Sequence, residues 1–194
     1  MGKKVAALML GFALLSVPAL YAAEYEIDTA HSHVGFSIRH IATKVKGSFG
    51  QFEGTFSFDE KNPAASKVNV TLKTASVNTS NEKRDAHLKT ADFFDVDKFP
   101  LATFVSKKVT SAGKGKFKAE GDLTLHGITK SVTLKVEHLG TENAFGSQIA
   151  GFTATTRIKR KDFGFDLGKA LESGKLVLSD EVDITMDIEA KAKK

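Results

Sequence analysis

The feature that most constrains this chain is a period-two alternation of apolar and polar residues along most of its length. Successive side chains of a β-strand point to opposite faces, so this pattern predicts strands with one dry and one wet face. Antiparallel sheets have this character. About eight strands and a short one at the start are expected, at residues 25–27, 33–40, 51–58, 68–73, 102–106, 117–125, 132–137, 150–158 and 182–189.

Small residues share the inward-facing register with large apolar ones, and this favours a barrel over a two-sheet sandwich. Gly54, Ala119, Gly121, Ala150 and Ala154 all fall in that register. An eight-stranded barrel closes around an interior that holds side chains or one small ligand. We therefore expect an all-β fold, a single antiparallel eight-stranded lipocalin-like barrel. Whether phenylalanine rings fill the space beside the small residues is left open.

One segment, Asn81–Phe94, has helical rather than strand character. Ser80 or Asn81 can cap its first turn, and Leu88 with Ala91 forms an apolar stripe. We expect a short helical segment here, placed against the barrel.

The first 22 residues are interpreted as a secretory signal peptide. Lys3 and Lys4 precede an apolar run at 5–15, and Pro18 and small residues follow. A membrane anchor is the alternative, but the run is shorter than the roughly 20 residues a spanning helix needs. Residues 23–194 then form one exported domain, and we expect it in the periplasm with no membrane span after cleavage.

Composition excludes several classes of chemistry. The chain has no cysteine, which removes disulfides, thiolate nucleophiles and cysteine-ligated metals. Its formal net charge of +5 is spread among interspersed charges, so no nucleic-acid-binding stripe is expected. The basic run at Arg157, Lys159, Arg160 and Lys161 is interpreted as a solvated strand face.

Four of the six histidines could indicate a metal site or a catalytic site. His31 and His33 would share one face of a strand, whereas alternation places His40 on the opposite, inward face. A zinc site needs three or four ligands, so no metal is expected. A hydrolase or metal-dependent enzyme using His31, His33 and His87 stays as the less favoured alternative.

The segment Arg84–Leu88 is the most polar cluster near the expected helix. One reading makes it a cap over the barrel mouth, where Arg84 or His87 meets a ligand head group. The other makes it a salt bridge that ties the helix to the barrel wall, and we weight that reading higher.

An ordered set of short motifs resembles the YceI family, also called the polyisoprenoid-binding family, across about residues 25–189. The motifs are Asp28-x-x-His31-Ser32-x-Val34-x-Phe36 with His40, Gly47-x-Phe49-x-x-Phe52-x-Gly54, Ser76-Val77-Asn78-Thr79, Arg84-Asp85-x-His87-Leu88 with Asp92-Phe93-Phe94, Phe99-Pro100, Gly121-x-Leu123-Thr124-Leu125-x-Gly127-Ile128-Thr129, Arg160-x-Asp162-Phe163-Gly164 and Asp180-Glu181-Val182.

The resemblance implies a lipocalin-like barrel that binds long amphiphilic lipids, such as prenyl chains of quinone or prenyl-phosphate type. It implies a binding protein rather than an enzyme, with no cofactor other than the bound lipid. The chain has no tryptophan, so the G-x-W signature of true lipocalins is missing and the likeness to them is architectural.

We therefore predict a periplasmic carrier for a polyisoprenoid or fatty-acid-like lipid. His40 and Arg84 are expected as polar contacts. The alternative is a stress-related structural or interaction protein whose barrel is filled by its own side chains; whether the protein is a monomer or a homodimer is left open. The interior is expected to be lined by Phe36, Ile38, Phe52, Phe56, Val70, Leu72, Leu123, Val132, Leu134, Phe152, Ile184 and Met186.

Overall fold

The fold is known from a computed structural model that describes residues 22–166 and 177–193. The expected signal segment therefore lies, apart from Ala22, outside the described residues, and its assignment stays a prediction. Among the described residues, no helix is long and apolar enough to cross a bilayer.

The described elements are almost all strands. The strands are β1 (Ala23–Ile27), β2 (His33–His40), β3 (Thr43–Phe49), β4 (Phe52–Phe58), β5 (Lys67–Lys73), β6 (Val77–Asn78), β7 (Leu101–Gly113), β8 (Lys116–Leu125), β9 (Ile128–Ala144), β10 (Ser147–Lys159) and β11 (Leu178–Ala192). The helical elements are α1 (Glu82–Lys89) and the 3-10 turns η1 (Pro63–Ala65), η2 (Thr74–Ser76) and η3 (Arg160–Phe163).

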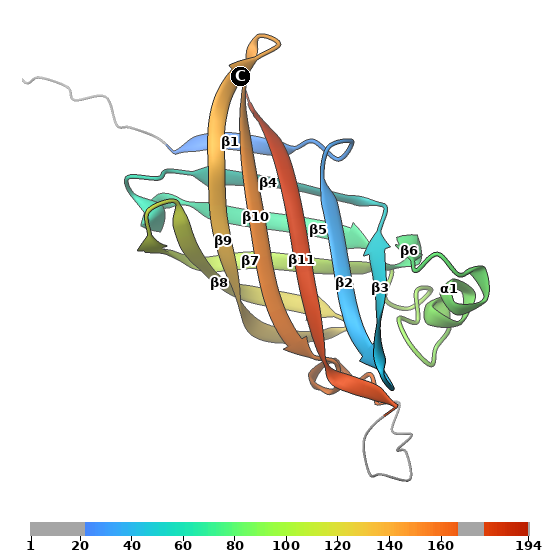
Figure 1. Cartoon of the computed structure of the whole chain (residues 1–194). Coiled ribbons are helices and arrows are strands. Elements are labelled where there is room, and N and C mark those ends of the chain that lie inside the picture. Colours follow the sequence, from blue (N-terminus) through green and yellow to red (C-terminus); the bar gives the residue numbers. More distant parts are fainter. Residues whose placement is uncertain (1–21, 167–176, 194) are drawn as a thin grey trace, which may run out of the picture.

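The strands form one closed antiparallel barrel. Hydrogen-bonded neighbours follow the order β1-β4-β5-β7-β8-β9-β10-β11, and β11 pairs back to β1. This confirms the predicted eight-stranded barrel. In Figure 1, β9, β10, β11 and β2 run side by side at the front, and β4, β5 and β7 cross behind them.

Three further strands extend the ring at the end that carries α1. β1 and β2 lie one after the other along β11, and β3 and β4 pair with β2 and β1 in the same antiparallel sense. β6 continues β5 in the same way and pairs with β3. Three stretches of the chain are therefore each interrupted once and form two strands: β1 and β2, β3 and β4, and β5 and β6. In each pair, one strand lies at one end of the barrel and the other strand at the opposite end.

β3 was not among the predicted strands, and its sequence explains why. It holds Val45 and Phe49 in one register, but Gly47 stands between them and lysines flank Val45. A Cβ at Gly47 would lie 2.4 Å from the Phe36 Cζ atom, because the Phe36 ring packs directly over this glycine. The apolar side chain that would complete the alternation of β3 at position 47 is thus replaced by the Phe36 ring of the neighbouring strand β2.

The helical segment is shorter than predicted. α1 ends at Lys89, and the Phe94 amide then donates to the Leu88 carbonyl at 3.0 Å, which folds the chain back. The Asn81 side chain accepts from the Arg84 amide at 3.0 Å, so Asn81 is the cap. Ala91 lies beyond the helix and is exposed, so the predicted Leu88–Ala91 stripe is wrong.

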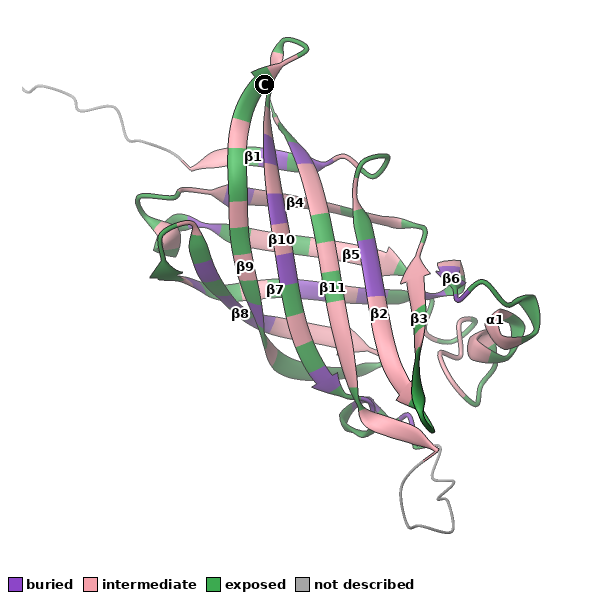
Figure 2. Ribbon diagram, viewed as in Figure 1, coloured by how far each residue is buried: buried purple, intermediate pink, exposed green. Residues whose placement is uncertain are grey.

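Buried side chains gather inside the barrel, most densely on β10 and at the end remote from α1 (Figure 2). There Phe152 contacts the rings of Phe56 and Phe58 edge to face, with centroids 5.3 and 5.0 Å away. At Gly121, a Cβ would lie 2.7 Å from the Phe104 ring, so this ring occupies the space that the missing side chain leaves. Rings thus fill part of the lumen, and the rest stays open.

Candidate functional site

The barrel interior holds two cavities that adjoin one another. The first chamber has a volume of about 180 Å³ and the second about 380 Å³. Five residues line both chambers and form the boundary between them, which we call the neck: Val34, Leu72, Ala102, Leu123 and Ile184. The alternative of a barrel filled by its own side chains does not match this interior.

The first chamber lies at the densely packed end and has no charged lining residue. Its polar lining groups are hydroxyls. The Ser57 hydroxyl accepts from the Lys67 amide at 3.1 Å, and the Ser66 hydroxyl accepts from the Asp59 amide at 3.0 Å. Because these hydroxyls are already engaged, the chamber suits a hydrocarbon chain, which needs no directional hydrogen bond.

The second chamber lies between the broken strands, α1 and η3. Four basic side chains line it, from His40, Arg84, His87 and Arg160, and its lining contains no carboxylate. The two chambers together are therefore largely apolar, with basic side chains at one end only. This is the polarity of an amphiphile with an apolar tail and a polar or anionic head.

Arg84 is held by Thr79 rather than by an acidic partner. Its Nε donates to the Thr79 hydroxyl at 2.7 Å and its Nη2 to the Thr79 carbonyl at 2.9 Å. The Thr79 hydroxyl in turn donates to Asp85 at 2.5 Å. The predicted salt bridge to the barrel wall is not seen among the described residues, and the guanidinium keeps its charge beside the cavity.

Arg160 is buried, with 4% of its surface exposed, so its assignment to a solvated strand face is wrong. Its guanidinium donates to the carbonyls of Ser179 at 3.0 Å and of Leu178 at 3.5 Å, and also to the carbonyl of Phe165. These acceptors are neutral, and the described part of the chain gives Arg160 no ion pair. Its charge is therefore solvated by backbone dipoles and is not neutralised by a carboxylate among the described residues.

All the predicted contact residues line one chamber or both. Their role in binding stays a prediction. The first chamber holds Phe52, Phe56, Val70, Val132, Leu134, Phe152 and Met186, the second holds Phe36, Ile38, His40 and Arg84, and both hold Leu72, Leu123 and Ile184.

Sequence reasoning missed several residues of the second chamber. Phe49 lies on the unpredicted β3, and Phe94 and Phe165 follow α1 and η3 in segments without strand periodicity. Arg160 carried a usable signal. It stands two residues after Ile158 and so continues the inward register of β10, where a charged residue is unusual.

A cluster of charged groups lies outside the chambers, where β1 closes on β11. Asp28, His31 and Glu189 each offer a ligand atom within 4.8 Å of the others. The Lys191 ammonium already lies 2.8 Å from an Asp28 carboxylate oxygen. It lowers the pKa of Asp28 to about 2, with His31 and the Ala30 amide adding to the effect. The cluster is thus an ion-paired strap across the seam.

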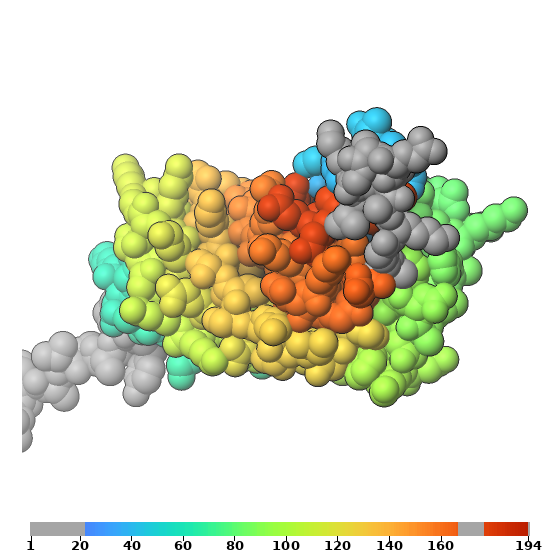
Figure 3. Space-filling view, turned by 90° about the horizontal axis from the view of Figure 1, so that it is seen from below, coloured from blue at the N-terminus to red at the C-terminus, as the bar shows by residue number. Residues whose placement is uncertain are grey.

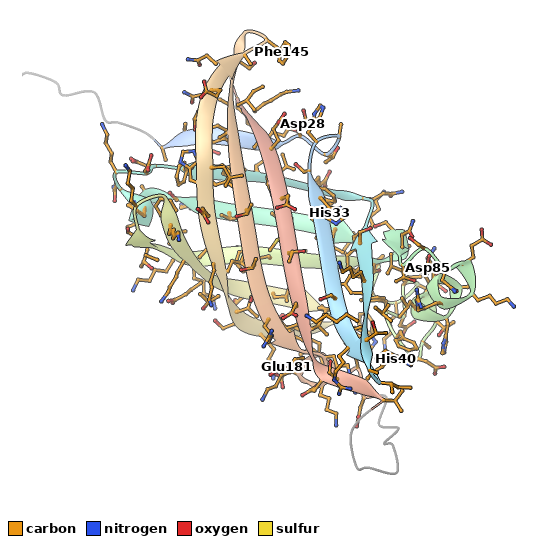
Figure 4. The ribbon with its side chains drawn as sticks, viewed as in Figure 1. Asp28, His33, His40, Asp85, Phe145 and Glu181 are labelled. Carbon is orange, nitrogen blue, oxygen red and sulfur yellow. The ribbon has the colours of Figure 1, made fainter. Side chains whose placement is uncertain are left out.

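The enzyme alternative needed His31, His33 and His87 to converge. Within residues 22–166 and 177–193, the one group of three metal-ligating side chains contains His31 but neither His33 nor His87. Figure 4 shows His33 and His40 at opposite ends of β2, with Asp85 away from both on α1. The three histidines of the enzyme alternative are therefore not brought together among the described residues.

Comparison with known proteins places this geometry in a family. The model of the YceI-like domain matches residues 25–190. A UPF0312 protein of Ectopseudomonas mendocina (strain ymp) is 46% identical over 183 residues, covering 91% of this chain and 95% of its own.

Solved structures agree with the fold. The Campylobacter jejuni YCEI protein is 36% identical, with a TM-score of 0.71, over 87% of this chain and 97% of its own. A polyisoprenoid-binding domain from Saccharophagus degradans, implicated in plant cell wall breakdown, has a TM-score of 0.66 over 89% of this chain and 99% of its own. Its identity is 16%, so this likeness concerns the fold alone.

Proposed function

Because this chain belongs to the YceI-like family, we propose that it is a periplasmic binding or carrier protein for a polyisoprenoid or a similar long-chain amphiphilic lipid. The observation that carries the proposal is the pair of adjoining apolar chambers, of which one has no charged lining residue and the other has four basic side chains in its lining. The S. degradans domain, which shares the fold and is described as polyisoprenoid-binding, is consistent with it.

The polarity of the interior sets the orientation of the ligand. The hydrocarbon tail lies in the first chamber and passes the neck, and the head group lies beside Arg84 and Arg160. An arginine recognises phosphate through several charge-assisted hydrogen bonds, so a prenyl phosphate fits this end better than a prenyl alcohol. A carboxylate head, as in a fatty acid, is the related case.

The energetics support a useful affinity. Together the chambers fall in the range of about 300–1,000 Å³ that is usual for ligand sites. Burying about ten methylene-sized groups at roughly 0.8 kcal/mol each gives on the order of 8 kcal/mol. Immobilisation of the chain offsets part of this, so micromolar binding is expected for a short chain and tighter binding for a longer one.

The neck offers the most direct test. Ala102 is buried and lines both chambers, so Ala102→Phe places a ring where the tail must pass. Val105 on the same strand points outward and is exposed, which makes Val105→Phe the matched control. In titration with a geranylgeranyl phosphate, we expect Ala102→Phe to lose at least tenfold in affinity and Val105→Phe to match the parent.

Thermal unfolding of both variants shows whether the barrel is intact. Native mass spectrometry of the protein purified from its source periplasm should show a co-purified lipid that Ala102→Phe lacks. Protein that is repeatedly recovered empty and takes up no added prenyl lipid contradicts the proposal.

A further inference from the structure

The hydrogen-bonded ladder between β9 and β10 covers only part of the length of these strands. Their ladder ends at the pair Thr155–Lys135. On either side the neighbouring ladders continue: β8 pairs with β9 as far as Ile128, and β10 pairs with β11 as far as Lys159. Among the described strands, residues 128–134 of β9 and 156–159 of β10 therefore border a window that no backbone ladder crosses.

Side chains close this window. The Thr156 hydroxyl donates to the Thr133 carbonyl at 3.0 Å, in place of a ladder bond. Below it η3 crosses from the end of β10 to the β8–β9 turn, where a His126 ring nitrogen lies 3.2 Å from the Phe163 carbonyl oxygen. The Phe163 ring is 1% exposed and packs in the same apolar cluster as Ile158 and Val132.

At the window the outer surface comes close to the cavities. An outward-facing hollow of about 1040 Å³ lies over it. Four of the hollow's lining residues also line the chambers: Val132, Thr156 and Ile184 line the first, and Ile158 and Ile184 the second. The yellow and orange atoms of Figure 3 show the face on which β9 and β10 meet. A few side chains thus separate solvent from the interior.

The border of the hollow is basic. It carries Lys44, Lys130, Lys135, Arg157 and Lys159 against two carboxylates, Asp162 and Asp183. Asp183 already pairs with Arg157 at 2.6 Å and with Lys44 at 3.0 Å. In the described part of the chain Lys130, Lys135 and Lys159 have no ion pair and are exposed. We call these three lysines the basic rim.

From these observations we propose that the window between β9 and β10 is a lateral portal, which docks on an anionic lipid surface through the basic rim and passes the hydrocarbon chain into the barrel. An apolar floor with a cationic border matches a bilayer whose headgroups are anionic. Because the window is closed by side chains, it can open without breaking a ladder hydrogen bond. The inference rests on the proposed lipid-carrier function.

The first test uses charge. A nitrobenzoxadiazole-labelled prenyl lipid is loaded on the protein, and its transfer to vesicles is followed by stopped flow. The triple variant Lys130→Glu, Lys135→Glu, Lys159→Glu is compared with Lys61→Glu, Lys67→Glu, Lys73→Glu, which makes the same charge change around β4 and β5. Each basic residue near an anionic surface contributes about fivefold in partitioning. We expect at least tenfold slower transfer to phosphatidylglycerol-containing vesicles for the rim variant and little change for the control.

The second test uses a cross-link, which is clean because the chain has no cysteine. Thr133→Cys with Arg157→Cys, two exposed positions on opposite sides of the window, is bridged by a short bis-maleimide. Glu137→Cys with Thr153→Cys spans the same strands where they are already paired and is the control. We expect bridging to slow transfer at least tenfold at the window and less than twofold at the control.

Equilibrium loading is measured beside both tests and separates the two proposals. A parent protein that binds no prenyl probe contradicts the carrier function itself. The portal is contradicted if loading is normal but the transfer rate does not depend on the rim charges, on the vesicle charge or on the bridge at the window. A rim variant that changes the oligomeric state instead of the transfer rate assigns the hollow to a second copy and also overturns it.

Discussion

The two chambers share one barrel but are built in different ways. The first is walled by paired strands, apart from the window between β9 and β10, and by phenylalanine rings packed edge to face, such as Phe56, Phe58 and Phe152. The second is walled partly by α1 and η3 and takes its charge from Arg84 and Arg160. The regular part of the fold thus provides apolar volume, and the irregular part provides the chemistry that can recognise a head group.

The largest expected effect is the loss of protein stability when a ring of the first chamber is removed. Phe152→Ala removes a buried ring from the aromatic cluster and should cost about 3–5 kcal/mol in the free energy of unfolding. Phe94→Ala at the second chamber removes a ring that is already partly exposed. It should cost only about 1–2 kcal/mol. Urea unfolding of both variants measures the difference; equal losses would mean that the second chamber is packed as tightly as the first.

The next effect concerns recognition in the second chamber. Arg84→Gln removes a guanidinium that has no acidic partner among the described residues, so the affinity for a prenyl phosphate should fall about tenfold, the size of one charge-assisted hydrogen bond. The affinity for the matching prenyl alcohol should stay the same. Lys83→Gln on the exposed side of α1 is the charge-matched control. Isothermal titration of both ligands is the measurement, and an equal loss for both would show that Arg84 acts on structure alone.

The same contrast explains what the sequence could predict. Alternation assigned Phe56 and Phe152 to the interior because each lies on a strand that pairs with both of its neighbours at that position. The same alternation found Val132, although β9 pairs there with β8 alone among the described strands. Phe94 and Phe165 could not be found in this way. Their segments have no period, and their positions are set by tertiary contacts, such as the edge-to-face packing of these two rings at 5.4 Å.

The two arginines of the second chamber make the point more sharply. Arg84 was expected as a polar contact because it stands in the polar cluster of the expected helix, and its partner Thr79 was not expected at all. Arg160 was assigned to solvent because it stands in a basic run with Lys159 and Lys161. Its position in the inward register was the better guide, since burial is decided by register rather than by the charge of adjacent residues.

A smaller effect is expected where α1 begins. Asn81→Ala removes the side-chain acceptor of the Arg84 amide, which should cost about 1 kcal/mol of helix stability. The loss should appear as faster hydrogen exchange in α1, with the ladder amides of β10 unchanged. Because Arg84 lies in this first turn, prenyl-phosphate affinity should fall slightly as well. Global acceleration of exchange would show that α1 is part of the barrel's cooperative core.

The smallest effect tests the strap at the barrel seam, away from both chambers. Asp28 has a pKa of about 2 instead of 3.8, chiefly because Lys191 donates to it. A carboxyl whose pKa is lowered by folding stabilises the protein at any pH above its unfolded-state pKa. This contribution is lost as the pH falls through the pKa of the folded state. Stability should therefore decline between about pH 4 and pH 2, and Asp28→Asn should flatten that decline. Solvent and salt screen the pair, which keeps the change small. Urea midpoints across this range measure it, and an unchanged pH profile in Asp28→Asn would assign the acid sensitivity to other carboxyls, such as Asp183 beside Arg157.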